Sequence, residues 1–415
     1  MPRRMLVLIA LAEFLGMTLW FSATAAAPAV AAEFAMGVSV RAWLTMAVQA
    51  GFVGGTLLTA VTNAADAIAA RRLFAAGCVI GAITNAGVAL APSAAVIIAL
   101  RFCTGAALAW VYPPGMKIAA GWFLERRGTA LGFIVGAVGV GSAFPHLLAW
   151  LGAGLPWRGI VTASSALAVG GAVIITLAVR DGPHVSASAP FDRHALRMVL
   201  QNRGVRLATF GYLGHMWELY AMWTWIAAFA STSLSRGAST SLSARAATGT
   251  GSLVAFIAIA SGSVGCVLAG RWADQWGKAR VAAAAMLASA TCAALSPLAF
   301  GAPFSALLIL VIVWGFTIVA DSAQFSALVA EHSPRTHVGT ALTLQTCAGF
   351  LLTMISMRLV TQISAAAGWK WAFVFLVPGP VLGALAMKRL ASQLPAPSLQ
   401  LPASREVQRK LPADS

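Results

Sequence analysis

Residues 13–20 read Glu-Phe-Leu-Gly-Met-Thr-Leu-Trp, and residues 218–225 read Glu-Leu-Tyr-Ala-Met-Trp-Thr-Trp. Each stretch places an acidic residue, then Met four positions on, then Trp seven positions on, inside an otherwise apolar segment. An ionisable group within a membrane span is costly, and its presence indicates a functional site. Because the motif occurs once in each half of the chain, it predicts two related helical bundles that face a shared site.

The composition places the chain in a membrane. Of its 415 residues 59% are hydrophobic and 10% are charged, and the mean hydropathy of +0.83 lies outside the range of soluble domains. A helical span needs about 20 mostly apolar residues. Twelve stretches qualify, near 5–26, 43–62, 73–92, 95–117, 129–151, 159–179, 206–230, 246–269, 281–299, 303–326, 339–361 and 370–387. We therefore predict an all-α integral membrane protein with twelve transmembrane helices in two pseudo-symmetric six-helix bundles, because open sheets cannot span lipid.

The net charge of +16 could suggest a nucleic-acid partner, but its distribution favours a membrane topology instead. If both termini are cytoplasmic, twenty of the 28 basic residues fall in inside segments and five in outside loops. This bias is the positive-inside rule. It predicts a multi-pass protein of the bacterial inner (plasma) membrane with both termini cytoplasmic and no nucleic-acid partner. The Arg3-Arg4 start resembles a signal peptide, but Glu13 interrupts the apolar run, so we expect a retained first helix.

Three further landmarks recur in the same order. Gly128-Thr129-Ala130-Leu131 returns as Gly339-Thr340-Ala341-Leu342, Trp157-Arg158 as Trp369-Lys370, and Asp66 as Asp274. This repeat predicts an N-terminal six-helix bundle at 1–180, a cytoplasmic linker at 181–205, a C-terminal six-helix bundle at 206–390 and a disordered cytoplasmic tail at 391–415.

Charge inside the predicted spans is restricted to certain helices. It comprises Glu13 on helix 1, Arg101 and Lys117 on helix 4, Glu218 on helix 7, Asp321 on helix 10 and Arg358 on helix 11. Helices 3, 6, 9 and 12 carry none in their interiors. Since an unpaired ion in lipid costs at least about 2.5–3.5 kcal/mol, we expect helices 1, 4, 7 and 10 to face a water-filled cavity and the third helix of each unit to face lipid. Lys117 and Arg358 lie near span ends, where snorkelling or gating is the better interpretation.

These features resemble the major facilitator superfamily over residues 5–390. The segment between helices 8 and 9 matches the cytoplasmic gate motif of that family through Gly270, Asp274, Gly277, Lys278 and Arg280. The resemblance implies that the Asp interacts with a helix end and basic partners to hold one conformation shut. The first-half copy keeps Asp66, Arg71 and Arg72 but has Thr62 and Ala69 in place of both glycines. Arg101, Gly105 and Ala109 resemble the helix 4 motif of the family, whose Arg is linked to proton transfer.

The subfamily is less clearly marked. Helix 5 carries Gly132, Gly136, Gly139 and Gly141 before Pro145, but it lacks the Gly-Pro pair and following Gly pair of the antiporter signature. The texture is closest to bacterial nitrate/cyanate permease-like members, through Tyr112-Pro113-Pro114-Gly115 and the segment 321–326. Nitrate carriers of this family place an Arg in helices 2 and 8. Here both helices carry no charge, so nitrate itself is disfavoured as substrate.

Two groups of residues form the predicted site, each with a structural alternative. The substrate and proton-coupling candidates are Glu13, Arg101, Glu218, Asp321, His146 and His215, and the cavity-lining candidates are Trp20, Gln49, Tyr112, Trp217, Tyr220, Trp225, Gln324 and Gln345. The acids could instead be neutralised structural groups, Arg101 an ion-pair strut, and each His a packing residue. Gln49, Asn85 and Gln345 are also ordinary candidates for hydrogen bonds between helices.

We predict a secondary active transporter that moves a small organic solute or anion by alternating access, with proton-coupled symport. A proton-driven efflux antiporter of an organic or toxic compound is the alternative, and a transporter-like membrane sensor without transport is an alternative of another class. The sequence shows no nucleophile motif, phosphate-binding loop or metal-ligand spacing, so we predict no enzymatic activity, no cofactor and no metal. The expected partners are a small-molecule substrate, protons and the lipid bilayer, and the expected state is a monomer.

Overall fold

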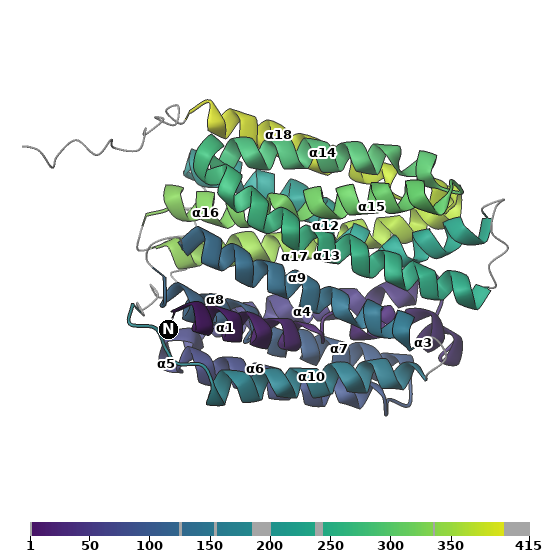
Figure 1. Cartoon of the computed structure of the whole chain (residues 1–415), viewed down its shortest axis with the longest axis horizontal. Coiled ribbons are helices and arrows are strands. Elements are labelled where there is room, and N and C mark those ends of the chain that lie inside the picture. The colour runs from purple at the N-terminus through teal and green to yellow at the C-terminus, as the bar shows by residue number, and fades with distance from the viewer. Residues whose placement is uncertain are drawn as a thin grey trace, which may run out of the picture.

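The computed structural model describes residues 2–123, 127–152, 156–184, 201–236, 244–334 and 337–393, with residues 65, 66, 127, 244 and 245 described by backbone alone. Every regular element in these ranges is helical (Figure 1). The first half contains α1 (Pro2–Met17), α2 (Ser22–Ala25), α3 (Ala27–Glu33), α4 (Val38–Val61), α5 (Ala64–Ala67), α6 (Ala70–Val88), α7 (Ala94–Leu108), α8 (Tyr112–Ala120), α9 (Arg127–Leu151) and α10 (Trp157–Leu177).

The second half follows the same plan. It contains α12 (Arg203–Arg236), α13 (Ala244–Trp276), α14 (Lys278–Ala299), α15 (Phe304–Ala320), α16 (Ser322–His332), α17 (Val338–Ala367), the short 3₁₀ helices η2 (Trp369–Trp371) and η3 (Val374–Leu376), and α18 (Pro378–Ala391). Most of the predicted linker and tail lie outside the described residues.

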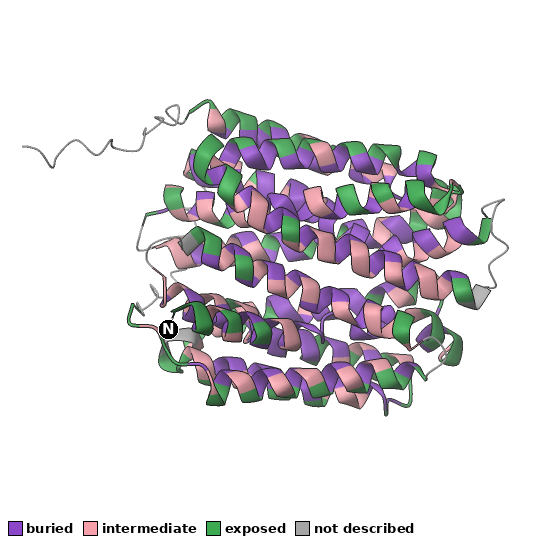
Figure 2. Ribbon diagram, in the orientation of Figure 1, coloured by how far each residue is buried: buried purple, intermediate pink, exposed green. Residues whose placement is uncertain are grey.

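Helices occupy all twelve predicted stretches. Among the described residues, nine helical segments are long and apolar enough to cross a membrane by length and composition. The other three are α1, α6 and α12, and α1 falls short because it ends after 16 residues. The predicted lipid-facing helices carry many exposed residues (green in Figure 2), and large apolar residues are among them, for example Ile83 of α6, Leu177 of α10, Leu298 of α14 and Leu382 of α18.

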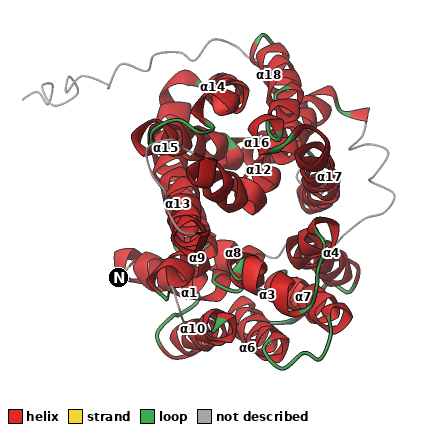
Figure 3. Ribbon diagram, turned by 90° about the vertical axis from the view of Figure 1, so that its right-hand side faces the viewer, coloured by secondary structure: helices red, strands yellow, loops and turns green. Residues whose placement is uncertain are grey.

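The helices form two bundles that lie side by side (Figure 3). We call α1–α10 the N-terminal bundle and α12–α18 the C-terminal bundle. They meet along two lines, where α9 packs on α13 and α4 packs on α17. Ser263 donates a hydrogen bond to the Gly136 carbonyl across the first line at 2.7 Å, and Thr353 donates to Gln49 across the second at 2.6 Å. We call the end of the molecule that carries the start of α1, α5 and the end of α18 the N-terminal face; it is at the left of Figure 1.

Within the described residues, the first, fourth and tenth spans are each broken into two α-helices. The first breaks at residues 18–21 between α1 and α2, the fourth at residues 109–111 between α7 and α8, and the tenth at Asp321 between α15 and α16. Pro113 and Pro114 open α8, where a missing N–H costs nothing. The seventh span, α12, is continuous over 34 residues. The two copies of the acid-Met-Trp motif therefore differ in backbone, because Trp20 lies in a break and Trp225 within a helix.

Candidate functional site

Aromatic rings from both bundles meet at the centre of the molecule. Trp20 lies with its ring centre 5.4 Å from Phe52, 5.7 Å from Tyr220 and 5.7 Å from Phe350. Tyr220 also contacts Trp223 at 5.5 Å. We call these five residues, together with Phe21, the aromatic cluster; Phe21 touches both Tyr220 and Trp223. The break after α1 and helix α4 of the N-terminal bundle face α12 and α17 of the C-terminal bundle here. The bundles therefore cannot separate without parting these rings.

Buried polar atoms without hydrogen-bond partners lie at the break after α1 and on α4, α9, α12 and α17. Within the described residues, the buried Trp20 Nε1 and Trp223 Nε1 donate to nothing, Gln49 Nε2 has no acceptor, and neither the amide of Gln345 nor the ring of His146 makes a hydrogen bond. The His146 ring lies 6.0 Å from Phe21. Buried polar groups are normally satisfied, and exceptions call for a bound group or water. These atoms are therefore candidates for binding a polar solute or water.

Glu13 is completely buried and has no hydrogen-bond donor on either oxygen within the described residues. Its carboxyl group packs against the backbone of α8 at Gly115, where a Cβ would overlap Oε1. An ionised carboxylate in such a place pays a large desolvation cost that nothing offsets. This packing therefore favours the neutral, protonated acid.

Glu218 is buried as well but is held by two donors. Ser289 of α14 donates to Oε2 at 2.8 Å, and the Trp314 indole of α15 donates to Oε1 at 2.6 Å. Its carboxyl group thus points into the C-terminal bundle. The structure places Glu13 and Glu218 in different environments, although the sequence repeat aligns them.

A third buried acid pairs with a histidine. Nδ1 of His215 on α12 lies 2.8 Å from Oδ1 of Asp321 at the break between α15 and α16, and both side chains are almost fully buried. The distance fits an ion pair when the imidazole is protonated, although the angle is not that of a regular hydrogen bond. His215 is three residues before Glu218, so both lie on one side of α12. The C-terminal bundle therefore gathers three titratable side chains in one region.

Arg101 is buried in the N-terminal bundle and binds only neutral groups among the described residues. Nε donates to the Leu44 carbonyl of α4 at 3.2 Å, Nη1 donates to the Leu19 carbonyl at 2.9 Å and to Asn85 of α6 at 2.8 Å, and Nη2 donates to the Trp20 carbonyl. The carbonyls of Leu19 and Trp20 are exposed by the break after α1. In lipid such freed backbone groups must find partners inside the protein. Arg101 supplies them, and no acid pairs with it among the described residues.

Two predicted cavity-lining residues lie elsewhere. Trp217 faces an outer groove beside α18, where its Nε1 lies 3.4 Å from the Phe375 carbonyl. Trp225 donates to the Met357 carbonyl of α17 at 3.1 Å and packs on Trp369. These positions correct the expectation that the two residues line the central cavity: α12 is continuous, so successive tryptophans point to different sides.

Of the remaining predicted residues, two lie beside the buried acids and two form hydrogen bonds between helices. Tyr112 opens α8, three residues before Gly115, against which Glu13 packs. Gln324 is buried one turn after Asp321 in α16. Gln49 bridges the two bundles through Thr353, and Asn85 donates to the Val161 carbonyl and Ser165, so both form the expected hydrogen bonds between helices.

The gate residues stay within their own bundles. Gly277 has a positive φ of 89°, which lets the chain turn between α13 and α14. Lys278 pairs with Glu331 of α16 at 2.7 Å, and Arg71 pairs with Asp181 at 3.1 Å. Asp274 is exposed and has no ion pair among the described residues. Gly270 lies near the end of α13, Arg72 near the start of α6 and Arg280 near the start of α14. The structure does not describe the side chain of Asp66.

An exposed ion pair closes the opposite face of the N-terminal bundle. Both Nη atoms of Arg158 bond to Glu33, at 2.9 and 2.5 Å, and the Trp157 indole donates to the same carboxylate at 2.7 Å. The hydrogen bonds from Arg158 and Trp157 lower the pKa of Glu33 below its ordinary value. This group fastens the end of α3 to the start of α10.

Several residues of the site were missed from the sequence. Phe52 and Phe350 complete the aromatic cluster, and Ser289 and Trp314 hold Glu218. Each is an ordinary residue of an apolar span, and no local pattern sets it apart. Their role depends on which helices become neighbours.

An all-helical membrane protein with two six-helix bundles and broken spans around buried charge has the architecture of a secondary transporter. The sequence profile described as Major Facilitator Superfamily matches residues 9–266 and 245–413, and the chain belongs to that family. No curated protein matches the chain. Among solved structures, a point mutant of the nucleoside transporter NupG superposes with a TM-score of 0.70 and 16% sequence identity, covering 93% of this chain and 99% of that one. The protein is thus a transporter rather than an enzyme, and the predicted fold is confirmed.

Proposed function

We propose that the protein carries a small organic solute together with protons, by symport across a bacterial inner membrane. The observation that carries the proposal is Glu13, a fully buried acid without a donor for either oxygen among the described residues. Such a group is stable as the neutral acid and becomes a carboxylate only when water or a donor reaches it. Movement of the bundles changes that access. One conformation can therefore bind the proton that the other releases.

The C-terminal bundle supplies a second proton site. The His215–Asp321 pair brings two buried titratable side chains within 2.8 Å of each other, and Glu218 lies one helical turn further along α12. Parting the bundles at the aromatic cluster would move α12, which carries Tyr220 and Trp223 as well as His215 and Glu218. Substrate binding and proton binding are thus linked through one helix.

The aromatic cluster favours a substrate with a flat or apolar part and several hydrogen-bonding groups. Rings offer stacking surfaces, while the free indole N–H groups, the amides and His146 offer donors and acceptors. Nucleosides fit this description, and one structurally similar protein is a nucleoside transporter. A small organic anion fits less well because Arg101 is already bound by carbonyls.

The topology follows from charge. Arg71, Arg180, Arg271, Lys278 and Arg389 are on or beside the N-terminal face, which we therefore assign to the cytoplasm. Both termini are then cytoplasmic. We propose the domain boundaries predicted above and a monomer as the transporting unit.

Transport by purified protein in liposomes tests the proposal. A thermal-shift screen of nucleosides, monosaccharides, amino acids and small organic acids would supply the substrate for uptake assays. We expect an inward proton gradient to drive accumulation, and a protonophore to abolish it. Glu13→Gln and Glu218→Gln should lose accumulation but keep exchange of substrate at equilibrium. Glu33→Gln, the same change at an exposed carboxylate, should keep both.

Two results would decide against this mechanism. If both buried Gln variants still concentrate substrate normally, the carboxylates are structural. If the proton gradient drives substrate out against its own gradient, the protein is an antiporter. Binding without any movement of substrate would instead support a sensor.

A further inference from the structure

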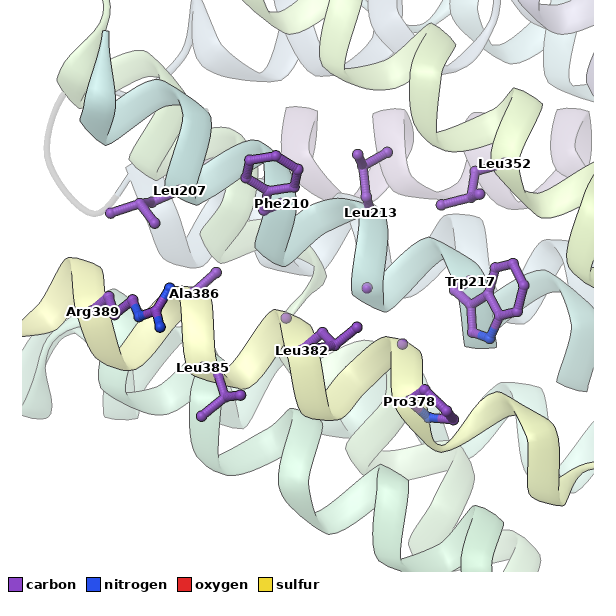
Figure 4. Close-up of a pocket in the computed structure, with 13 residues that line it drawn as sticks. Leu207, Phe210, Leu213, Trp217, Leu352, Pro378, Leu382, Leu385, Ala386 and Arg389 are labelled. Carbon is purple, nitrogen blue, oxygen red and sulfur yellow. The ribbon is translucent and has the colours of Figure 1, made fainter.

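An apolar groove runs along the outer flank of the C-terminal bundle, away from the aromatic cluster. It has a volume of about 640 Å³ and lies between α12 and α18, with Leu352 of α17 at its back (Figure 4). Its rim is formed by large apolar side chains that are well exposed: Phe210 at 60%, Leu382 at 64% and Leu385 at 48%. In a membrane this surface faces lipid.

Glycines form the floor of the groove. A Cβ at Gly214 would overlap the Gly379 carbonyl, and one at Gly379 would overlap the ring of Trp217. These residues let α12 and α18 approach closely, so the walls rise from a tight contact between helices. The groove is therefore a fixed feature of how the two helices pack.

The length of the groove matches one leaflet of a bilayer. Its α12 wall runs from Leu207 to Trp217, which is about 15 Å at a rise of 1.5 Å per residue. The hydrocarbon core of a bilayer is about 30 Å thick. An acyl chain from one leaflet would thus lie along the whole groove, with its end near Trp217.

Positive charge lies at one end only. Arg389 lines the groove beside Leu207, at the opposite end from Trp217 and Pro378 (Figure 4). Arg206 is exposed one turn before Phe210 on the same side of α12. Neither Arg206 nor Arg389 has an acidic partner among the described residues. Basic pockets between spans bind anionic lipid headgroups.

We propose that this groove holds an acyl chain of an anionic phospholipid from the leaflet at the N-terminal face, with the phosphate bound by Arg389 and Arg206. The groove is lined by Leu213, Gly214 and Trp217 of α12, and the same stretch of α12 presents His215 and Glu218 to the bundle interior. Lipid in the groove would therefore press on the helix that carries His215 and Glu218. This proposal is independent of the transported substrate.

Native mass spectrometry of the full-length protein with phosphatidylglycerol or phosphatidylcholine tests the site. We expect retained phosphatidylglycerol on the wild type and binding about fivefold weaker in Arg389→Gln, the factor for one basic residue at an anionic surface. Lys388→Gln is the matched control, because it removes the same charge from the neighbouring exposed position that does not line the groove. It should bind like the wild type. Glycerol phosphate, which has the headgroup phosphate but no chains, should not compete.

A second measurement locates the acyl chain of the bound lipid. A phosphatidylglycerol with a photoreactive acyl chain should crosslink to residues 207–217 and 378–389, and Leu385→Trp should reduce this crosslinking by filling the rim. Equal losses in Arg389→Gln and Lys388→Gln, or crosslinks spread over all outer helices, would show general attraction of anionic lipid to a basic face and overturn the proposal. So would equal retention of phosphatidylcholine and phosphatidylglycerol.

Discussion

The two bundles bury charge in opposite ways. The N-terminal bundle buries the cation Arg101 among backbone carbonyls and one amide, whereas the C-terminal bundle buries Glu218, Asp321 and His215 with few partners each. An arginine does not lose its proton in a protein, so its hydrogen bonds act as permanent structure. Acids and histidines change charge as their surroundings change. From this comparison we propose a structural role for Arg101, and proton binding for the C-terminal bundle and for Glu13, which has no hydrogen-bond partner among the described residues.

The largest effect should come from Arg101. Arg101→Gln removes the donor that the guanidinium supplies to the carbonyls of Leu19, Trp20 and Leu44, and each buried group left unsatisfied costs about 1–3 kcal/mol. Arg101→Lys keeps the charge but cannot reach groups on several helices at once. We expect both variants to unfold at much lower temperature in detergent, and Arg358→Gln, which removes an arginine with no side-chain bond among the described residues, to change little. Stable Arg101→Lys with lost transport would show that the charge itself is functional.

A smaller effect should separate the buried acids. Asp321→Asn loses the ion pair with His215. Glu218→Gln replaces one of the two oxygens that accept from Ser289 and Trp314 by an NH₂ group, which cannot accept. Each change should therefore cost about 1–3 kcal/mol of unfolding free energy. Glu13→Gln has no donor to lose and should leave stability almost unchanged. Denaturation of the three purified variants measures this order. If Glu13→Gln is the most destabilised of the three, its carboxylate has a partner that our interpretation lacks.

The smallest effect should come from the exposed pair. Because Arg158 and Trp157 lower the pKa of Glu33 in the folded protein, the stabilisation is fully present above the unfolded value of about 4.3 and is lost as the pH falls through the lower folded value. Glu33→Gln should therefore melt slightly lower than the wild type at pH 7, with the difference vanishing in acid. A difference that persists at low pH would assign the effect to the Trp157 hydrogen bond rather than to charge.

The gate and repeat motifs show how far local patterns reach. Gly277 turns the chain between α13 and α14, as its motif predicts, since only glycine adopts its positive φ without strain. The acid-Met-Trp motif was a weaker guide. It located two buried acids in the correct spans, but it did not distinguish the broken first span from the continuous α12, because no Pro or Gly marks residues 18–21.

By itself the sequence determined the membrane class, the all-helical fold, the twelve spans and the family, because apolar run length and charge distribution act locally along the chain and lipid leaves no other way to satisfy the backbone. It also placed the buried charge on the correct helices. Only the tertiary structure decided what each charge does. Arg101 binds the backbone carbonyls that the break after α1 exposes. Glu13 has no hydrogen-bond partner among the described residues because Gly115 of α8 packs against its carboxyl group. Those outcomes depend on contacts between segments far apart in the chain, which local residue patterns do not encode.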